Sequence, residues 1–445
     1  MSQNKLRTFY TIILTQTFSL IGSRISSLAV GIWVYEQTGN ATPLALVAFF
    51  SVLPMVLASS LSGVLADRWD RRIVMVLSDA GQALGTLLLF FSFATNSFEL
   101  WHLYAVSIIQ STFGVFQGPA FQASVTMLIP DDERDRANAI QQLTGPAASV
   151  FAPAIAAFIY AVIDVEGAIL VDLFTFIVAM IVIFSVRIPR PEETEEGRKL
   201  KGSILKEMMG GLTYLWERKP LFLTVCYLSM VNFLIAGASL LNTPYILART
   251  NNNEFALGVI ISLMNLGGIL GAITLGQRKN IQRRMPTIIY GLIITSSAIM
   301  FAGMAQNMYV LGINMIIVMI PLPVINALFM SIIQRKVAPD VQGRVFSVLS
   351  QMSMLLTPIS YLLIGPLADK VFEPAIGAAG WSTVAPFVGD SQGAGMGLLI
   401  TCAGFFTLII TLAVYSIPAM RNIETALPDH VIQPEMELEA QPALS

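Results

Sequence analysis

Charged residues are scarce in this chain: Asp, Glu, Lys and Arg make up 12% of its 445 residues, while 55% are hydrophobic. Soluble domains carry about 25% charged residues, so the composition excludes an ordinary soluble enzyme. The two cysteines, Cys226 and Cys402, lie in apolar runs and exclude a disulfide framework. The two histidines, His102 and His430, leave no histidine-based metal site or catalytic dyad, and we expect no cofactor. With a formal net charge of −2, the chain has no basic surface for nucleic acid.

Long apolar runs make up most of the chain. A helix that spans a bilayer needs about 20 mostly apolar residues, and six such runs precede a polar stretch and six follow it. They are 9–35, 44–66, 73–94, 103–128, 139–163, 167–186, 220–247, 255–275, 286–305, 309–333, 345–367 and 395–417. Pro130-Asp131 after the fourth run and Pro339-Asp340 after the tenth indicate a duplication. The sequence therefore predicts an all-α membrane protein with twelve transmembrane helices in two six-helix bundles.

The placement of Lys and Arg predicts the orientation, because short loops that carry these residues stay in the cytoplasm. With the N-terminus inside, only Arg249 and Lys370 of the 26 Lys and Arg fall in outside loops, and Arg24 lies within the first run. We therefore expect both termini to be cytoplasmic and the protein to lie in the cell (inner) membrane.

Polar segments divide the chain into four parts. Residues 1–190 and 220–420 hold the two bundles. Residues 191–219 form a cytoplasmic linker whose apolar residues recur at helical spacing, which predicts an amphipathic helix either at the lipid interface or on the cytoplasmic face of the bundle. Residues 421–445 are acidic and proline-rich and predict a disordered cytoplasmic tail.

A decapeptide lies between the second and third runs: Gly63-Val64-Leu65-Ala66-Asp67-Arg68-Trp69-Asp70-Arg71-Arg72. It resembles the cytoplasmic loop signature of the major facilitator superfamily, with Asp70 where the family often has glycine. Glycine allows close helix approach, and an aspartate can face the N-terminus of another helix. The resemblance implies a cytoplasmic gate that closes against the eleventh span, whereas a plain positive-inside loop is the alternative. The predicted gate residues are Gly63, Asp67, Arg68, Arg71 and Arg72.

Other stretches narrow the resemblance. Residues 117–122, Gln-Gly-Pro-Ala-Phe-Gln, and the turn 130–139 resemble the branch that includes macrolide exporters and the enterobactin exporter. This implies a secondary active transporter that exports a small amphiphilic compound, such as a drug, a macrolide or a siderophore, by alternating access. No Gly-Lys dipeptide occurs, so there is no phosphate loop for ATP, and we expect a monomer driven by a proton gradient. Of the family's antiporter signature on the fifth helix, only Gly145-Pro146 is present.

Three charged residues lie inside apolar runs. Arg24, near the middle of the first run, is costly in lipid and must face a partner or water. It either binds an anionic group in the cavity or pairs with a nearby acid. Asp79 and Asp172 are candidate proton carriers, and the alternative is a shallow carboxylate that water reaches or a hydrogen-bond acceptor at a helix end. Other carboxylates before the tail in the second half fall in predicted loops, which places a proton site in the first half.

The family resemblance also implies that the first, fourth, seventh and tenth helices line a substrate cavity. Polar side chains on the last three are the candidates, although amides between apolar helices also form interhelical hydrogen bonds. The candidates are Gln110, Gln117, Asn232, Asn242 and Asn326. One alternative function is an organic-anion importer or exchanger that uses Arg24 as its substrate anchor. A non-transporting membrane enzyme is a remote alternative, since no catalytic residues cluster at one membrane depth.

Overall fold

The computed structural model describes residues 2–68, 70–128, 134–186, 213, 215–277, 281, 283–337, 345, 348–349 and 351–426. All regular elements among them are helices, as the apolar runs predict. In the first half these are α1 (Ser2–Thr38), α2 (Thr42–Arg68), α3 (Arg71–Ala94), α4 (Leu100–Leu128) and α5 (Arg134–Ser185).

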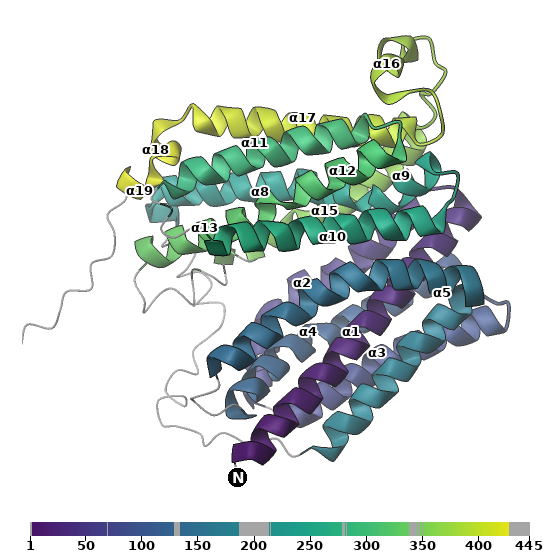
Figure 1. Ribbon diagram of the computed structural model, residues 1–445, viewed down its shortest axis with the longest axis vertical. Coiled ribbons are helices and arrows are strands. Elements are labelled where there is room, and N and C mark those ends of the chain that lie inside the picture. The colour runs from purple at the N-terminus through teal and green to yellow at the C-terminus, as the bar shows by residue number, and fades with distance from the viewer. Residues whose placement is uncertain are drawn as a thin grey trace, which may run out of the picture.

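The long helix α5 is two helices joined at a turn. Asp164 has φ 62° and ψ −173°, a backbone conformation that interrupts helical hydrogen bonding and that few residues other than glycine adopt. The turn falls in the short polar gap that separates the predicted fifth and sixth spans. Figure 1 shows the two arms of α5 folding back from this point.

The second half holds shorter elements, because proline begins or interrupts several of them. They are α8 (Lys219–Leu240), α9 (Asn242–Arg249), α10 (Glu254–Gln277), α11 (Arg284–Gly303), α12 (Met308–Met319), α13 (Pro321–Lys336), α15 (Thr357–Leu367), a π-helical turn (Ala368–Phe372), a 3₁₀ turn (Trp381–Thr383), α16 (Ala385–Val388), α17 (Ala394–Tyr415), α18 (Pro418–Arg421) and α19 (Ile423–Ala426). The predicted seventh run is divided at Leu241, just before Pro244, and the tenth run is divided at Ile320, just before Pro321.

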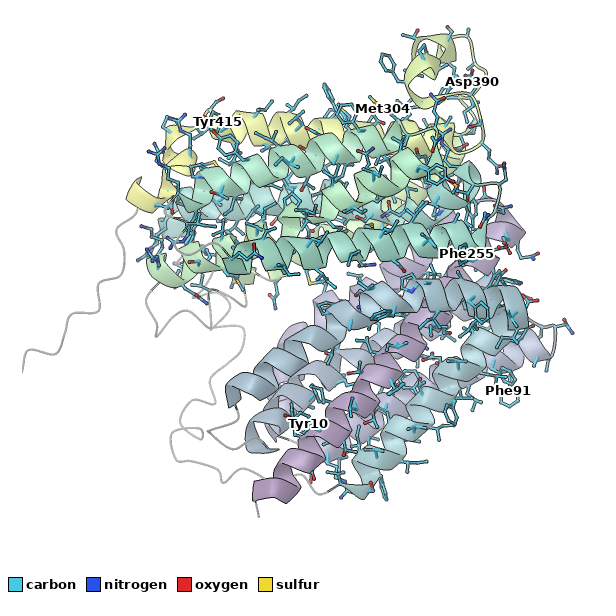
Figure 2. All side chains as sticks on the ribbon, in the orientation of Figure 1. Tyr10, Phe91, Phe255, Met304, Asp390 and Tyr415 are labelled. Atoms are coloured by element: carbon cyan, nitrogen blue, oxygen red, sulfur yellow. The ribbon has the colours of Figure 1, made fainter. Side chains whose placement is uncertain are left out.

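Nine helices in the described part of the chain are long and apolar enough to cross a membrane. One of them, Thr144–Ser185, has 42 residues, which is about twice the length that a bilayer core of roughly 30 Å requires. Large apolar side chains face outward, among them Phe91 at 55% and Phe255 at 67% exposed (Figure 2), as suits a surface in lipid. The protein is therefore a multi-pass helical membrane protein, while the count of twelve spans and the cytoplasmic termini remain predictions.

The helices form two bundles that converge at one end of the molecule and diverge toward the other (Figure 1). We call the converging end, with the turns at Asn96, Asp164 and Asn251, the distal end. The opposite end, with the start of α1, the turn at Asp70 and α18–α19, is the terminal end. At the distal end one apolar core joins residues of both halves, whereas at the terminal end each half has a core of its own.

Small residues bring the two bundles together toward the distal end. Gly258 of α10 lies against α5, and a Cβ atom there would lie 2.7 Å from the Cβ of Ala157 and 2.8 Å from the carbonyl oxygen of Pro153. The helix backbones are therefore in direct contact, with no room for a side chain between them.

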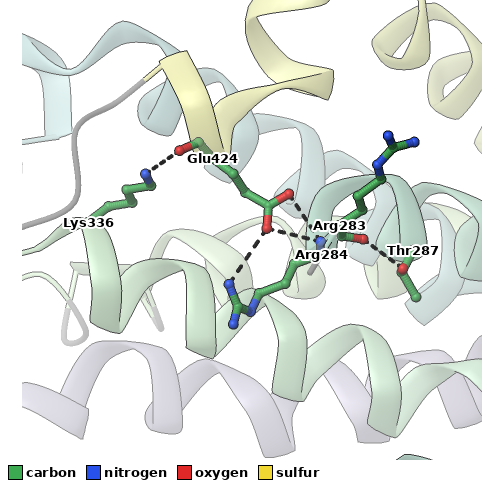
Figure 3. Close-up of polar contacts among 5 residues, drawn as sticks. All are labelled: Arg283, Arg284, Thr287, Lys336 and Glu424. Carbon is green, nitrogen blue, oxygen red and sulfur yellow. Dashed lines mark hydrogen bonds and ion pairs between the residues drawn. The ribbon is translucent and has the colours of Figure 1, made fainter. Parts of the chain in front are cut away.

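Two residues that follow Met420, Ile423 and Glu424, belong to the second bundle, and Figure 3 shows the contacts of Glu424. Ile423 is fully buried. The carboxylate of Glu424 accepts hydrogen bonds of 3.0 and 3.1 Å from the backbone N–H of Arg284, at the start of α11, and its carbonyl accepts one of 2.5 Å from Lys336 Nζ. The sequence assigned residues 421–426 to the tail, but 423–426 are helical, and Ile423 and Glu424 pack on the second bundle through an apolar side chain and a helix-capping acid. The rest of the predicted tail, 427–445, and most of the linker 191–219 lie outside the described residues.

Candidate functional site

Asp79 of α3 lies at the centre of a hydrogen-bonded group of amides. Gln117 of α4 donates to its Oδ1 at 2.5 Å, and Gln16 of α1 donates to its Oδ2 at 3.2 Å. The Gln117 amide also donates to Gln16 Oε1 at 2.8 Å and accepts from Gln82 Nε2 at 2.8 Å. We call Gln16, Asp79, Gln82 and Gln117 the Asp79 layer; it joins three helices of the first bundle.

Asp172, on the second arm of α5, lies in a similar group of hydroxyls. Ser23 of α1 donates to its Oδ1 at 2.9 Å, and Thr86 of α3 donates to its Oδ2 at 3.0 Å. Gln110 of α4 donates to Thr86 Oγ1 at 2.9 Å. We call Ser23, Thr86, Gln110 and Asp172 the Asp172 layer; it joins α1, α3, α4 and α5.

The two layers are related by one repeat along three helices. Residues seven apart lie on the same helix face, about 10.5 Å apart along the axis, so three such pairs on adjacent helices form two stacked layers. The pairs are Gln16 and Ser23 on α1, Asp79 and Thr86 on α3, and Gln110 and Gln117 on α4. A polar column therefore runs through the first bundle between the two carboxyl groups.

Both carboxyl groups are buried and have only neutral partners. Asp79 is 0% exposed and Asp172 is 2% exposed, so neither is the shallow, water-reached carboxylate that the sequence allowed. Within the described part of the chain neither forms an ion pair. Burying an unpaired charge costs free energy, whereas a carboxyl group that binds a proton is neutral and gains a donor. The geometry is therefore suited to proton binding.

Arg24 is placed differently. Its side chain is exposed, although its neighbours Ser23 and Ile25 are partly or fully buried. Among the described residues it has no hydrogen bond or ion pair, so the predicted pairing with a nearby acid is not formed there. Its guanidinium is free for solvent or for a ligand.

The five predicted cavity amides have different surroundings in the structure. Gln110 and Gln117 belong to the two polar layers. Asn232 donates to the carbonyl of Ser353 at 2.8 Å, which is the interhelical role that the sequence left open.

In the second half, Asn242 lies 3.7 Å from the sulfur of Met264 and lines a small cavity inside the bundle. Asn326 is exposed on α13. Of the three amides predicted in the second half, only Asn326 has an exposed side chain.

The predicted gate motif lies at the end of α2 and the start of α3. The side chains of Gly63–Arg68 and of Arg71 lie outside the described residues, so the roles of Gly63, Asp67, Arg68 and Arg71 remain predictions. Asp70 caps α3 by accepting a hydrogen bond of 3.0 Å from the backbone N–H of Arg72.

Arg72, also predicted in the gate, binds within its own bundle. Its Nε donates to the carbonyl of Ile183 at 3.3 Å, its guanidinium donates to the carbonyl of Phe184, and it stacks 5.2 Å from the Phe184 ring. An arginine on the last carbonyls of a helix stabilises that helix end, so Arg72 caps the C-terminus of α5.

Sequence reasoning missed four members of the polar layers: Gln16, Ser23, Gln82 and Thr86. Each of these residue types is common on helix surfaces, so a single one does not indicate a site. The signal in the sequence was a pair of polar residues seven positions apart in each of three apolar runs, one pair of which includes Asp79.

This architecture, with two helical bundles around an axis between them and buried carboxyls in one, defines the class as a multi-pass membrane transporter. The family model of the Major Facilitator Superfamily matches residues 12–361, and the chain belongs to that family.

Curated relatives carry efflux names. The chain is 25% identical over 366 residues to macrolide efflux protein A of Streptococcus pyogenes, covering 82% of this chain and 90% of the relative. It is 22% identical over 359 residues to the multidrug efflux pump Tap of Mycolicibacterium fortuitum, covering 78% and 86%. The chain is therefore a transporter that resembles the macrolide-efflux branch, and the enzyme alternative finds no support among these relatives.

Solved structures share the fold. A bacterial homologue of the human lysosomal transporter Spinster, in an inward-facing and unoccupied conformation, superposes with a TM-score of 0.69 at 14% identity, over 92% of this chain and 95% of that one. A bacterial homologue of the iron transporter ferroportin, in an inward-facing state, gives 0.66 at 12%, over 93% and 99%.

Proposed function

We propose that the protein exports small amphiphilic organic compounds, of the macrolide or multidrug kind, from the cell in exchange for protons. The observation that carries the proposal is the pair of buried carboxyls, Asp79 and Asp172, each held by neutral donors of several helices. The efflux names of the relatives support the substrate class.

Proton binding changes what each carboxyl group does in its layer. An ionised carboxylate only accepts hydrogen bonds, whereas a protonated one also donates. Protonated Asp79 would donate to an amide oxygen of Gln16 or Gln117, and those amides would have to turn. Because the layer joins α1, α3 and α4, this rearrangement biases how the helices of the first bundle pack.

Alternating access follows from the two ends of the molecule. Among the residues that the structure describes, the halves share a core only at the distal end, so in this conformation the path between them would be closed there and open toward the terminal end. With the terminal end in the cytoplasm, as the Lys and Arg placement predicts, this is the state that loads cargo for export. Exposed Arg24 and Asn326 would then face the substrate path.

The test uses purified protein in proteoliposomes that carry a radiolabelled macrolide and an imposed pH gradient. Asp79→Asn and Asp172→Asn keep the size of each side chain and remove proton binding. We expect both variants to lose accumulation driven by the gradient by at least about tenfold, while exchange of labelled for unlabelled macrolide without a gradient persists.

The matched control is Asp390→Asn, which removes an exposed carboxylate of a distal loop (Figure 2) and should transport as the unsubstituted protein does. Gradient-driven accumulation that survives in Asp79→Asn/Asp172→Asn would overturn proton coupling through these residues. Absence of macrolide exchange in the unsubstituted protein would overturn the substrate class.

A second function is favoured by one observation: Arg24 on α1 is exposed and has no hydrogen bond or ion pair to any residue that the structure describes. A guanidinium open to the substrate path suits a carboxylate or phosphate group, and would make the protein an organic-anion importer or exchanger. Arg24→Gln should then abolish binding of organic acids but leave binding of neutral amphiphiles unchanged. Equal binding of both classes to Arg24→Gln would exclude this function.

A further inference from the structure

The six-residue start of the gate motif recurs in the second half. Gly365-Pro366-Leu367-Ala368-Asp369-Lys370 matches Gly63-Val64-Leu65-Ala66-Asp67-Arg68 in its glycine, leucine, alanine and aspartate and in its final cation. The first copy ends α2, and the second covers the end of α15 and the π-helical turn after it. The second copy therefore lies at the distal end of the molecule.

In this second copy, the aspartate binds the other half of the protein. Asp369 Oδ1 accepts a hydrogen bond of 2.8 Å from the backbone N–H of Ala41, and Oδ2 accepts one of 2.6 Å from that of Thr42. Thr42 is the first residue of α2, so the carboxylate satisfies two N–H groups that have no partner within the helix. The negative charge also faces the positive end of the helix dipole.

The glycine of the second copy allows this contact. A Cβ atom on Gly365 would lie 2.7 Å from the Cα of Thr42 and 2.7 Å from the Cβ of Ala45, closer than atoms pack. The absence of a side chain therefore lets α15 reach α2 and brings Asp369 within hydrogen-bonding distance of the α2 N-terminus.

The two copies are related by the direction of their helices. α2 runs from the distal to the terminal end, and α15 runs the opposite way, so the C-terminus of each helix lies at the same end of the molecule as the N-terminus of the other. Asp369 occupies at the distal end the position that the family resemblance gives to Asp67 at the terminal end. Because the described contacts between the halves are distal, the Asp369 contact is the one made in this conformation.

We propose that Gly365 and Asp369 form a distal latch that holds the two bundles together in the terminal-open state and must release before cargo leaves at the distal side. The proposal rests on transport by alternating access, but the latch is defined by conformation and can be measured without cargo. Asp67 would form the opposing contact after the halves rock, so the two latches would be made in turn.

The test measures the distance between the halves at the distal end. Spin labels are attached through Ala94→Cys at the end of α3 and Tyr309→Cys at the start of α12, both exposed positions, in full-length protein with Cys226→Ser and Cys402→Ser in lipid nanodiscs. Pulsed electron spin resonance then gives the share of molecules with a long distal distance.

Asp369→Asn removes the charge at the α2 N-terminus and replaces one acceptor oxygen by a donor. We expect it to raise the ratio of distal-open to distal-closed molecules by about three- to thirtyfold. Gly365→Ala should shift the distances in the same direction, because its methyl group pushes against α2. Asp390→Asn is the matched control: its carboxylate is exposed and has no hydrogen bond or ion pair in the described part of the chain, and its distances should stay as in the parent.

Unchanged distances in both Asp369→Asn and Gly365→Ala would overturn the latch, as would an equal shift in Asp390→Asn. The same labelled proteins can be assayed for macrolide exchange. If the variants change the distal distance but the parent protein exchanges no macrolide, the latch is supported and the export proposal is overturned. The two proposals are therefore tested separately.

Discussion

The two halves of the protein treat buried polarity in opposite ways. In the first half, buried carboxyl groups accept hydrogen bonds from side chains of other helices, from amides in the Asp79 layer and from hydroxyls in the Asp172 layer. In the second half, buried hydroxyl groups bind backbone carbonyls or each other. For example, the Tyr245 hydroxyl lies 3.0 to 3.1 Å from three carbonyl oxygens, and Tyr227 donates to Thr411 at 3.1 Å. The layers of the first half contain buried carboxyl groups that can bind a proton, whereas these hydroxyl groups of the second half do not supply such a site.

Three carboxylates of the second half bind the N-terminal ends of helices. Asp369 binds the start of α2, Glu373 accepts from the backbone N–H of Met396 at 2.8 Å at the start of α17, and Glu424 binds the start of α11. A carboxylate on a helix N-terminus is stabilised as an anion. These groups therefore bind helix ends, and the comparison assigns proton-dependent rearrangement inside a bundle to the layers of the first half.

The largest expected effect is the loss of a buried carboxyl group from the first half. Asp79→Leu leaves the amides of Gln16 and Gln117 without their acceptor in an apolar interior, and we expect a loss of about 3 kcal/mol in the free energy of unfolding. Denaturation in mixed micelles measures it. Asp79→Asn, which keeps one acceptor oxygen, should lose about 1 kcal/mol. Equal stability of the leucine variant and the parent would show that the layer is not a buried network.

A hydroxyl of the second half should matter less and should not affect coupling. Tyr245 is fully buried and its hydroxyl lies on the carbonyls of Ala302, Gly303 and Ala305, at the end of α11. Tyr245→Phe removes a neutral hydrogen bond, and we expect a loss of about 1 to 1.5 kcal/mol in unfolding free energy with the pH dependence of transport unchanged. A changed pH dependence in Tyr245→Phe would end the division of roles between the halves.

Much of the fold was predictable because it depends on local patterns. Apolar runs of bilayer length predicted the helices, and the polar gap after residue 163 predicted the turn at Asp164. The breaks at Leu241 and Ile320 were missed because the runs around them are apolar, although Pro244 and Pro321 mark both places. Asp79 and Asp172 stood out since a charge inside an apolar run is costly.

Other parts depend on contacts between distant segments, which composition does not reveal. Ile423 and Glu424 belong to an acidic stretch that resembles a disordered tail. Ile423 is held by the apolar core of the second bundle, and Glu424 by the start of α11 and by Lys336. In the same way, Arg72 was assigned to the gate by its motif, whereas the last carbonyls of α5 bind it. A motif predicts the residue types, and the partner follows from packing.

The two halves also have matched charged caps at the terminal end, and these should have similar, smaller effects. Arg72 binds the C-terminal carbonyls of α5, and Glu424 binds the N-terminal amide of α11 with an ion pair of 3.7 Å to Arg284. We expect Arg72→Gln and Glu424→Gln each to lose about 1 kcal/mol in unfolding free energy, and high salt to reduce the difference from the parent. A loss in only one variant would break the symmetry of the two caps.

The smallest expected effect is a pH dependence of stability at the distal end of the second half. Glu373 lies just outside the span Gln351–Phe372, and burial raises its pKa, although the N–H groups of Met396 and Gly393 and the charge of Arg249 oppose this. A carboxyl group whose pKa rises on folding binds more protons folded than unfolded. Its contribution to stability is thus present at acidic pH and is lost as pH rises through the folded pKa.

Glu373→Gln should remove this contribution to the pH dependence. As the pH rises from about 4 to about 7, the melting temperature of the parent should fall relative to that of Glu373→Gln. Differential scanning fluorimetry in detergent measures this difference. Asp390→Asn removes an exposed carboxylate and keeps Glu373, so it should follow the parent. If the melting temperature of the parent instead rises relative to that of Glu373→Gln, the two N–H groups and Arg249 lower the Glu373 pKa more than burial raises it. Glu373 would then bind the start of α17 as an anion.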